Sequence, residues 1–278
     1  MPDTLSHSLG PSSLRRRTLG ALLGAALTLG LALGAASPAA VQAAEIRVVT
    51  SGGFSAAYDQ LVPLYEQATG NKVTTARGAS IGNAPDSIPS RMARGEQFDI
   101  VILADSALDK LIEQGKVQAG SRVDLARSMI GMSVRKGTPR PDISTVDALR
   151  QTLLNAKSIA YSASASGTYL STELFQRLGV AEQIKDKAKK IYSERVGAVV
   201  LRGDAEIGFQ QVSELLPFKE LDFVGPLPDE VQQRVFFSAG VATGAQEPEA
   251  ARQLIRFLAA PAAASIVRST GMEPAAAR

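Results

Sequence analysis

Short apolar segments alternate with amphipathic segments along the first half of the chain. The apolar segments 46–50, 72–75 and 98–103 predict β-strands, and each is followed by a loop of small residues. Between the strands, apolar residues recur at helical spacing and predict helices that end at Gly70 and near Arg94. The segment 98–103 is apolar almost without interruption, which indicates a strand buried on both faces of a sheet.

The same alternation resumes after residue 128. It predicts strands over 129–134, 159–161, 190–192, 206–209 and 231–241, and helices over 146–155, 195–201, 248–258 and 261–268, with a further helix that ends at Gly179. Strands and helices that alternate with short loops predict an α/β protein built from doubly wound sheets. In such sheets ligands bind at the carboxyl ends of the strands, where the small-residue loops lie.

The segment 162–169, Ser-Ala-Ser-Ala-Ser-Gly-Thr-Tyr, joins a predicted strand to a predicted helix. Small and hydroxylic residues at a helix N-terminus leave backbone N–H groups accessible, and the positive end of the helix dipole favours an anion there. This pattern makes Ser164, Ser166, Gly167 and Thr168 candidate ligand-binding residues. The alternative is that Ser166 or Thr168 only caps the helix.

The N-terminal segment 1–43 has the pattern of a secretory signal peptide. Three arginines, 15–17, precede an apolar run, 19–33, and a cleavage site of small residues follows at 41–43. A membrane anchor is the alternative, but the run is short and rich in Gly and Ala. The arginines are compatible with general or twin-arginine export, and the sequence does not decide between them.

Removing 1–43 leaves 27 of the 30 basic residues and 26 of the 27 acidic ones, so the mature chain is nearly neutral. This balance argues against a nucleic-acid partner. The chain contains no cysteine, and its one histidine, His7, lies in the predicted signal peptide. A Ser-His-Asp triad or a His/Cys metal site therefore cannot form. From these absences we expect a binding protein with no catalytic residues, no metal and no cofactor, and not an enzyme.

Several segments together resemble a known family. These are the first strand and loop at 46–55, the segment FDIVILADSALDKLIEQGKV at 98–117, the Ser-Gly-Thr-Tyr loop at 166–169, and SERVGAVVLRGDAEIGF at 193–209. They resemble type II periplasmic solute-binding proteins of ABC importers, within them the molybdate-binding branch. The resemblance implies two lobes with a ligand cleft between them, the first formed by 44–127 and 237–278 and the second by 128–236. It also implies a periplasmic monomer that delivers a small anion to an ABC permease in the inner membrane.

The resemblance further implies which residues hold the ligand. By motif, the second-strand serine falls on Ser80, the loop amide on Ser166 or Gly167, and the helix amide on Val196. The first-loop serine of that branch falls on Gly53, within a loop that also contains Ser51, Phe54 and Ser55, and its tyrosine falls on Gln211. Two side chains of the usual oxyanion site are thus missing or displaced.

Two arginines stand beside these loops, Arg77 and Arg195. A guanidinium pairs bidentately with a carboxylate, which a site of neutral donors does not do. One interpretation is therefore a molybdate- or tungstate-like oxyanion held by neutral donors. The alternative is an organic di- or tricarboxylate held by Arg77 and Arg195. A third possibility is that both arginines face solvent.

Overall fold

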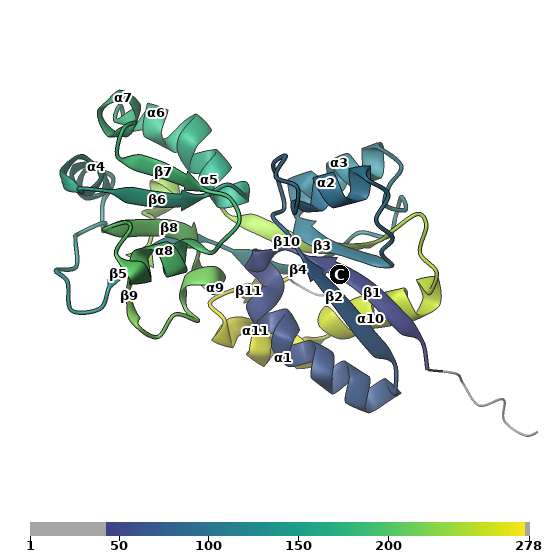
Figure 1. Cartoon of the computed structure of the whole chain (residues 1–278). Coiled ribbons are helices and arrows are strands. Elements are labelled where there is room, and N and C mark those ends of the chain that lie inside the picture. Colours follow the sequence, from purple (N-terminus) through teal and green to yellow (C-terminus); the bar gives the residue numbers. More distant parts are fainter. Residues whose placement is uncertain (1–42, 276–278) are drawn as a thin grey trace, which may run out of the picture. The chain divides into compact units, whose positions relative to one another are not determined.

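The computed structural model describes residues 43–275, which form two mixed β-sheets with helices on both faces of each (Figure 1). The predicted signal peptide, apart from residue 43, lies outside these residues. None of the helices in the described range is long and apolar enough to cross a membrane.

The first sheet has six strands in the order β11-β4-β10-β3-β1-β2. Its strands are β1 (Glu45–Thr50), β2 (Lys72–Arg77), β3 (Ile100–Ala104), β4 (Val123–Ser128), β10 (Val235–Val241) and β11 (Glu273–Pro274). The strands β2, β1 and β3 are parallel, and β10 lies antiparallel between β3 and β4. The sheet is therefore mixed, because the chain returns to it in the opposite direction after passing through the second sheet.

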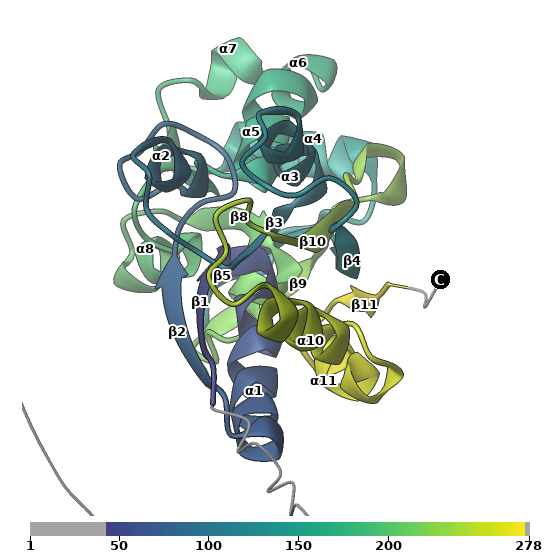
Figure 2. The ribbon, with the colours of Figure 1, turned by 90° about the vertical axis from the view of Figure 1, so that its right-hand side faces the viewer.

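Successive side chains of the central strands point to opposite faces of the first sheet. Val48 packs in a core with α1 (Gly52–Thr69), α10 (Pro248–Leu258) and α11 (Ala264–Ser269), whereas Val49 packs in a separate core with α2 (Ile88–Ala93) and α3 (Asp105–Glu113). Figure 2 shows the first group of helices below the sheet and the second group above it. The sheet is thus covered on both faces, as its continuous apolar strand β3 requires.

The second sheet has five strands in the order β7-β6-β8-β5-β9. They are β5 (Ile130–Arg135), β6 (Ile159–Ser162), β7 (Ala188–Ile191), β8 (Ile207–Gln211) and β9 (Leu221–Pro226). One face carries α4 (Val146–Asn155), α5 (Ala165–Tyr169), a π-helical turn (Leu170–Leu174), α6 (Phe175–Arg177) and α7 (Ala181–Ile184). The other face carries α8 (Val196–Arg202), and the short helix α9 (Val212–Leu215) follows β8 directly.

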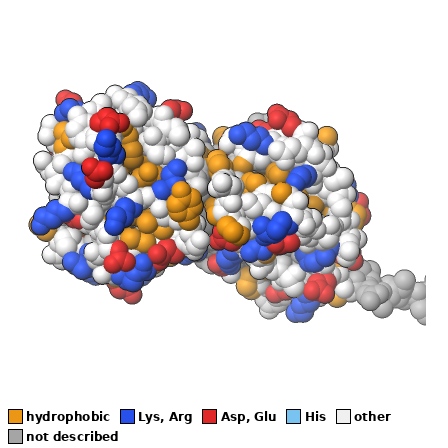
Figure 3. Space-filling view, turned by 45° about the horizontal axis from the view of Figure 1, so that its top comes forward, with side chains coloured by type: hydrophobic (Ala, Val, Ile, Leu, Met, Phe, Trp, Pro, Cys, Tyr) orange, Lys and Arg blue, Asp and Glu red, His pale blue; other side chains and the backbone are white. Residues whose placement is uncertain are grey.

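Each sheet with its helices forms one lobe, so the predicted two-lobe α/β fold is confirmed. The chain passes from the first sheet to the second between β4 and β5, and returns at β10. The residue boundaries of the lobes, 127/128 and 236/237, stay a prediction. On the face shown in Figure 3, acidic and basic side chains are interspersed over both lobes.

Three strands were not predicted, the two-residue strand β11 and the longer strands β4 and β9. The β4 sequence, Val-Asp-Leu-Ala-Arg-Ser, is interrupted by charges, and β9 ends in Gly225 and Pro226. Both strands are partly exposed over much of their length, so neither has the continuous apolar run that marks the central strands. Their place in the fold comes from pairing with β10 and β5, which single-sequence periodicity does not reveal.

Candidate functional site

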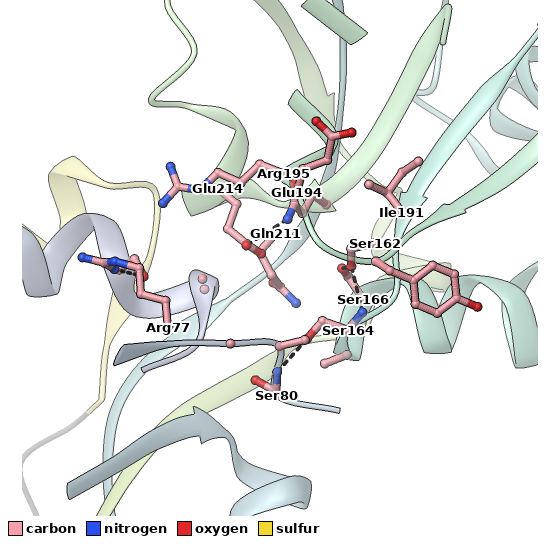
Figure 4. A pocket seen from close by; sticks show the side chains of 18 of the residues that line it. Arg77, Ser80, Ser162, Ser164, Ser166, Ile191, Glu194, Arg195, Gln211 and Glu214 are labelled. Atoms are coloured by element: carbon pink, nitrogen blue, oxygen red, sulfur yellow. Dashed lines mark hydrogen bonds between the residues drawn. The ribbon is translucent and has the colours of Figure 1, made fainter. Parts of the chain in front are cut away.

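A cavity of about 260 Å³ lies between the two lobes, where the loops after β1, β2, β6, β7 and β8 meet (Figure 4). Pockets for small molecules commonly measure about 300–1,000 Å³, so this one suits a small ligand. Its position at the carboxyl ends of the strands is the one that the doubly wound topology predicts.

Two hydrogen bonds join the lobes at this cavity. The backbone N–H of Ser80, after β2, donates to the hydroxyl of Ser164, before α5, at 3.1 Å. The hydroxyl of Ser213, in α9, donates to the carbonyl of Gly53, in α1, at 2.6 Å. The cavity is therefore bounded by direct contacts between the lobes.

The serines that line the cavity are already engaged in hydrogen bonds. The Ser80 hydroxyl accepts from the N–H of Ala104 at 3.0 Å, and the hydroxyls of Ser162 and Ser166 lie 3.0 Å apart. The Ser55 hydroxyl donates to the Ser51 carbonyl. The Ser55 hydroxyl also accepts from Arg77, and the Ser162 hydroxyl also accepts from the N–H of Ser164. The Ser80 and Ser166 hydroxyls have one hydrogen bond each among the described residues and keep capacity for a further partner.

The two predicted arginines both line the cavity, but their environments differ. Arg77 donates to the Ser55 hydroxyl at 2.8 Å and to the Asp59 carboxylate at 2.6 Å, and it is nearly half exposed. In the described part of the chain, the Arg195 guanidinium has no hydrogen bond or ion pair to another side chain. Arg195 is therefore the cation that remains available for an anionic ligand.

Gln211, at the end of β8, offers an unpaired amide to the cavity. The residue is only 2% exposed, and both its Nε2 and its Oε1 are buried without a hydrogen-bond partner among the described residues. Figure 4 shows its side chain pointing toward Ser164. A buried polar group without a partner costs about 1–3 kcal/mol, which a ligand that pairs with it would offset.

A buried carboxylate, Glu214, also lines the cavity and was not predicted. Its Oε1 accepts from Nε2 of Gln210 at 2.8 Å, and Oε1 of Gln210 accepts from the N–H of Val196 at 3.0 Å. Burial raises the pKa of Glu214 to about 7, although Arg195 and the Gln210 hydrogen bond both lower it. Desolvation therefore outweighs the favourable charge and leaves a carboxyl that titrates near neutrality.

Two glycines at the start of α1 make room for groups of the opposite lobe and of β10. A Cβ on Gly52 would lie 1.9 Å from Oε1 of Glu214, and a Cβ on Gly53 would lie 1.9 Å from the ring of Phe237. Neither position has space for a side chain. The Phe237 ring occupies the space that a serine side chain at position 53 would need.

Of the predicted binding residues, those that line the cavity are Gly53, Ser55, Arg77, Ser80, Ser164, Ser166, Arg195 and Gln211. Their role in binding stays a prediction. The others, Ser51, Phe54, Gly167, Thr168 and Val196, are not among the lining residues.

Each of these five exceptions has a structural reason. Ser51 is the buried residue before α1, and Phe54 lies in the core of the first lobe. Gly167 packs so closely on β6 that a Cβ would lie 1.6 Å from the Ser162 carbonyl oxygen. The backbone N–H of Thr168 is engaged within its own helix, where it donates to the Ser164 carbonyl. The Val196 N–H, expected to hold the ligand, donates to Gln210 instead.

The family model for bacterial extracellular solute-binding proteins matches residues 46–273, and the chain belongs to this family. The molybdate-binding protein ModA of Azotobacter vinelandii is 27% identical over 238 residues, 84% of this chain and 91% of that protein. A solved structure of the periplasmic molybdate-binding protein of that organism has a TM-score of 0.68 at 20% identity, covering 84% of this chain and 100% of that one. The predicted resemblance to type II periplasmic binding proteins of the molybdate-binding branch is thereby confirmed.

A second relative corrects the prediction that the chain is not an enzyme. An aconitate isomerase of Pseudomonas sp. is 45% identical over 240 residues, which cover 86% of this chain and 92% of that protein. The prediction was wrong because it gave too much weight to the absence of His and Cys and to the lack of a carboxylate pair placed by motif. A buried carboxylate also serves as an acid or a base. The expectations of no metal and no cofactor stay predictions.

Sequence signals for the missed residues were weak. Gln210 and Glu214 follow the apolar core of β8 at the carboxyl end of the strand, the position where ligand-contacting residues are expected. Nothing in the local sequence distinguishes Glu214 from an exposed glutamate of a short helix. Its burial depends on Gly52, which is distant in the sequence and belongs to the other lobe.

Proposed function

We propose that this protein binds a small tricarboxylate of the aconitate type in the interlobe cavity and isomerises it. The observation that carries the proposal is that the Arg195 guanidinium and the Gln211 amide line the same small cavity, and neither has a side-chain hydrogen bond or ion pair among the described residues. A carboxylate ligand would pair with the guanidinium and accept from the amide. The 45% identity to an aconitate isomerase supports the same class of substrate.

A molybdate-like oxyanion suits this cavity less well. The backbone N–H of Val196, one of the neutral donors that the resemblance implies, is already paired with Gln210. Glu214 adds a carboxylate to the cavity, which in its ionised form repels a compact dianion. A larger tricarboxylate can place its carboxylates at Arg195 and Gln211 and leave an uncharged part of its carbon skeleton beside Glu214.

The family supports an extracytoplasmic location and a small ligand. A member of the extracellular solute-binding proteins acts outside the cytoplasm on a small ligand. Export through the segment 1–43, an ABC permease as partner, the monomeric state and the absence of a nucleic-acid partner remain our predictions.

The proposal is tested with the full mature protein and purified cis- and trans-aconitate. We expect proton NMR to show conversion of either isomer into a mixture of both, and calorimetry to show binding of aconitate and none of molybdate. Arg195→Ala is expected to weaken aconitate binding by about 10–100-fold, the equivalent of one charge-assisted hydrogen bond.

Arg234→Ala is the matched control, because Arg234 pairs with Asp229 outside the cavity. The Arg234→Ala variant should bind aconitate with the same affinity as the unmodified protein. Tight molybdate binding together with no binding of either aconitate isomer would refute the proposal.

A further inference from the structure

The carboxyl of Glu214 is held in a fixed position within the cavity. Its Oε1 accepts from Nε2 of Gln210, whose own Oε1 is fixed by the N–H of Val196 at the start of α8. On the other side, the backbone at Gly52 approaches so closely that no side chain fits there. The carboxyl is therefore oriented from both lobes, with Oε2 left without a hydrogen-bond partner among the described residues.

We propose that Glu214 is the catalytic acid–base, which transfers a proton between the two outer carbons of the tricarboxylate. This inference rests on the proposed function and names the residue that carries it out. Gln210 acts as the positioning residue, because it contacts the carboxyl and not the reacting atoms.

The chemistry of the substrate defines the step. Aconitate is propene-1,2,3-tricarboxylate, in which a methylene carbon and a double-bonded carbon flank the central carbon. The Glu214 carboxylate removes a methylene proton, and the electron pair of the broken C–H bond forms a new double bond to the central carbon. The electrons of the old double bond then take up a proton from the Glu214 carboxyl at the other outer carbon. That proton is the one just removed or, after exchange on the carboxyl, one from solvent. Atoms and charges balance, so the step needs no oxidant, reductant or co-reactant.

The step exchanges the roles of the two outer carbons. The geometry of the new double bond is set by the rotation about the former single bond, so a substrate bound in the right conformation emerges as the other isomer. Because both outer carbons flank one central carbon, a single carboxylate on one face of the molecule suffices. The negative charge that develops spreads onto the substrate carboxylates, where Arg195 and the Gln211 amide can stabilise it.

The other carboxylates that line the cavity are less suited to this role. Glu194 is held by a bidentate ion pair with Arg202, at 2.7 and 2.9 Å. Asp86 is only partly buried, whereas Glu214 is 8% exposed. Desolvation raises the pKa of Glu214 to about 7, which suits a group that must both accept and donate a proton near neutral pH.

The decisive experiment compares the unmodified protein with Glu214→Gln in deuterated water. Proton NMR follows both the interconversion of the aconitate isomers and deuterium at the methylene carbon, and calorimetry follows binding. We expect Glu214→Gln to lower the isomerisation rate by about 10²–10⁴-fold and to abolish deuterium uptake, while aconitate affinity stays within a few-fold. Glu249→Gln is the matched control, since Glu249 is an exposed partner of Arg252 outside the cavity.

The outcomes separate this inference from the proposed function. If the unmodified protein binds and isomerises aconitate and Glu214→Gln does so at an equal rate, Glu214 is not the acid–base and the inference fails alone. If the unmodified protein neither binds nor isomerises aconitate, the proposed function itself fails, and the inference with it. Circular dichroism of Glu214→Gln distinguishes a folded, inactive variant from an unfolded one.

A second variant tests the role of Gln210 and does not depend on Glu214→Gln. The hydrogen bond from Gln210 lowers the pKa of Glu214, so Gln210→Met should raise it. The rising limb of kcat/KM against pH should then move to higher pH. Among the elements packed against Glu214, Arg195 is the charged group that acts on it, while Gly52 and Gln210 carry no charge. A loss of activity with an unmoved pH profile would assign Gln210 a merely structural role and would count against Glu214 as the titrating base.

Discussion

Replacing Glu214 by Gln should make the protein more stable at alkaline pH and leave its stability at acidic pH almost unchanged. The two side chains have nearly the same shape, and Gln can still accept the hydrogen bond from Gln210. The substitution therefore removes one titration and keeps the packing of the cavity.

The magnitude follows from the pKa of Glu214, which burial raises from the ordinary value of 4.5 to about 7. Between these two pH values the folded protein retains a proton that the unfolded chain releases, so the free energy of unfolding falls as pH rises. The stabilisation is fully present below about pH 4.5 and is lost once pH has risen through about 7. The difference in pKa corresponds to about 3 kcal/mol, and the near-complete burial of the group means that solvent screening reduces it little.

Urea unfolding of the unmodified protein and of Glu214→Gln, at a series of pH values from about 4 to about 8, measures this difference. Subtracting one curve from the other cancels the titrations that the two proteins share. We expect the variant to gain about 3 kcal/mol over the unmodified protein across the series. Glu249→Gln, at an exposed ion pair, should show no such trend. A stability difference that does not change with pH would refute the argument that Glu214 is desolvated.

Three further substitutions test other parts of the cavity. Gln211→Ala removes an amide that has no protein partner, so the free energy of unfolding should change by less than about 1 kcal/mol while calorimetry shows aconitate affinity reduced about 5–10-fold; severe destabilisation would contradict this. Gly53→Ser places atoms in the ring of Phe237 and should cost about 1–3 kcal/mol in a urea titration, and unchanged stability would show that the ring moves freely. Arg77→Ala breaks a half-exposed ion pair with Asp59, so urea unfolding should show a loss below about 1 kcal/mol, and a larger loss would mean that the pair is more important than its exposure implies.

Much of the fold could be predicted because its elements follow local rules. The helix α4 has the predicted bounds, and α1 ends at Gly70, whose φ of 77° is the left-handed conformation that glycine adopts readily. The apolar strand β3 is fully buried, as its composition predicts. The strands β4 and β9 were not predicted. Each is partly exposed and is held in place by pairing with a neighbouring strand, which local sequence does not reveal.

The sequence predicted those cavity residues that lie at the carboxyl ends of strands, because the topology of the sheets fixes their position. Ser80 lies in the loop after β2, Ser166 lies in the first turn of α5 and Gln211 ends β8. All three line the cavity at the carboxyl edge of a sheet. Val196 shows the limit of this reasoning, because whether its N–H is free depends on a side chain of β8. Glu214 was missed for a similar reason, since its burial comes from contacts between the lobes.

The differences from the molybdate-binding pattern are linked by packing. Where that branch has a first-loop serine, Gly53 leaves room for Phe237, and the neighbouring Gly52 leaves room for the Glu214 carboxyl. The loss of a neutral donor and the entry of a carboxyl therefore both depend on the two adjacent glycines, Gly52 and Gly53. A site that holds an oxyanion with neutral donors gains nothing from a buried carboxyl, because the two charges repel each other. A site that moves a proton on a carbon skeleton requires such a group, so the glycines of the first loop are themselves an argument for catalysis in this cleft.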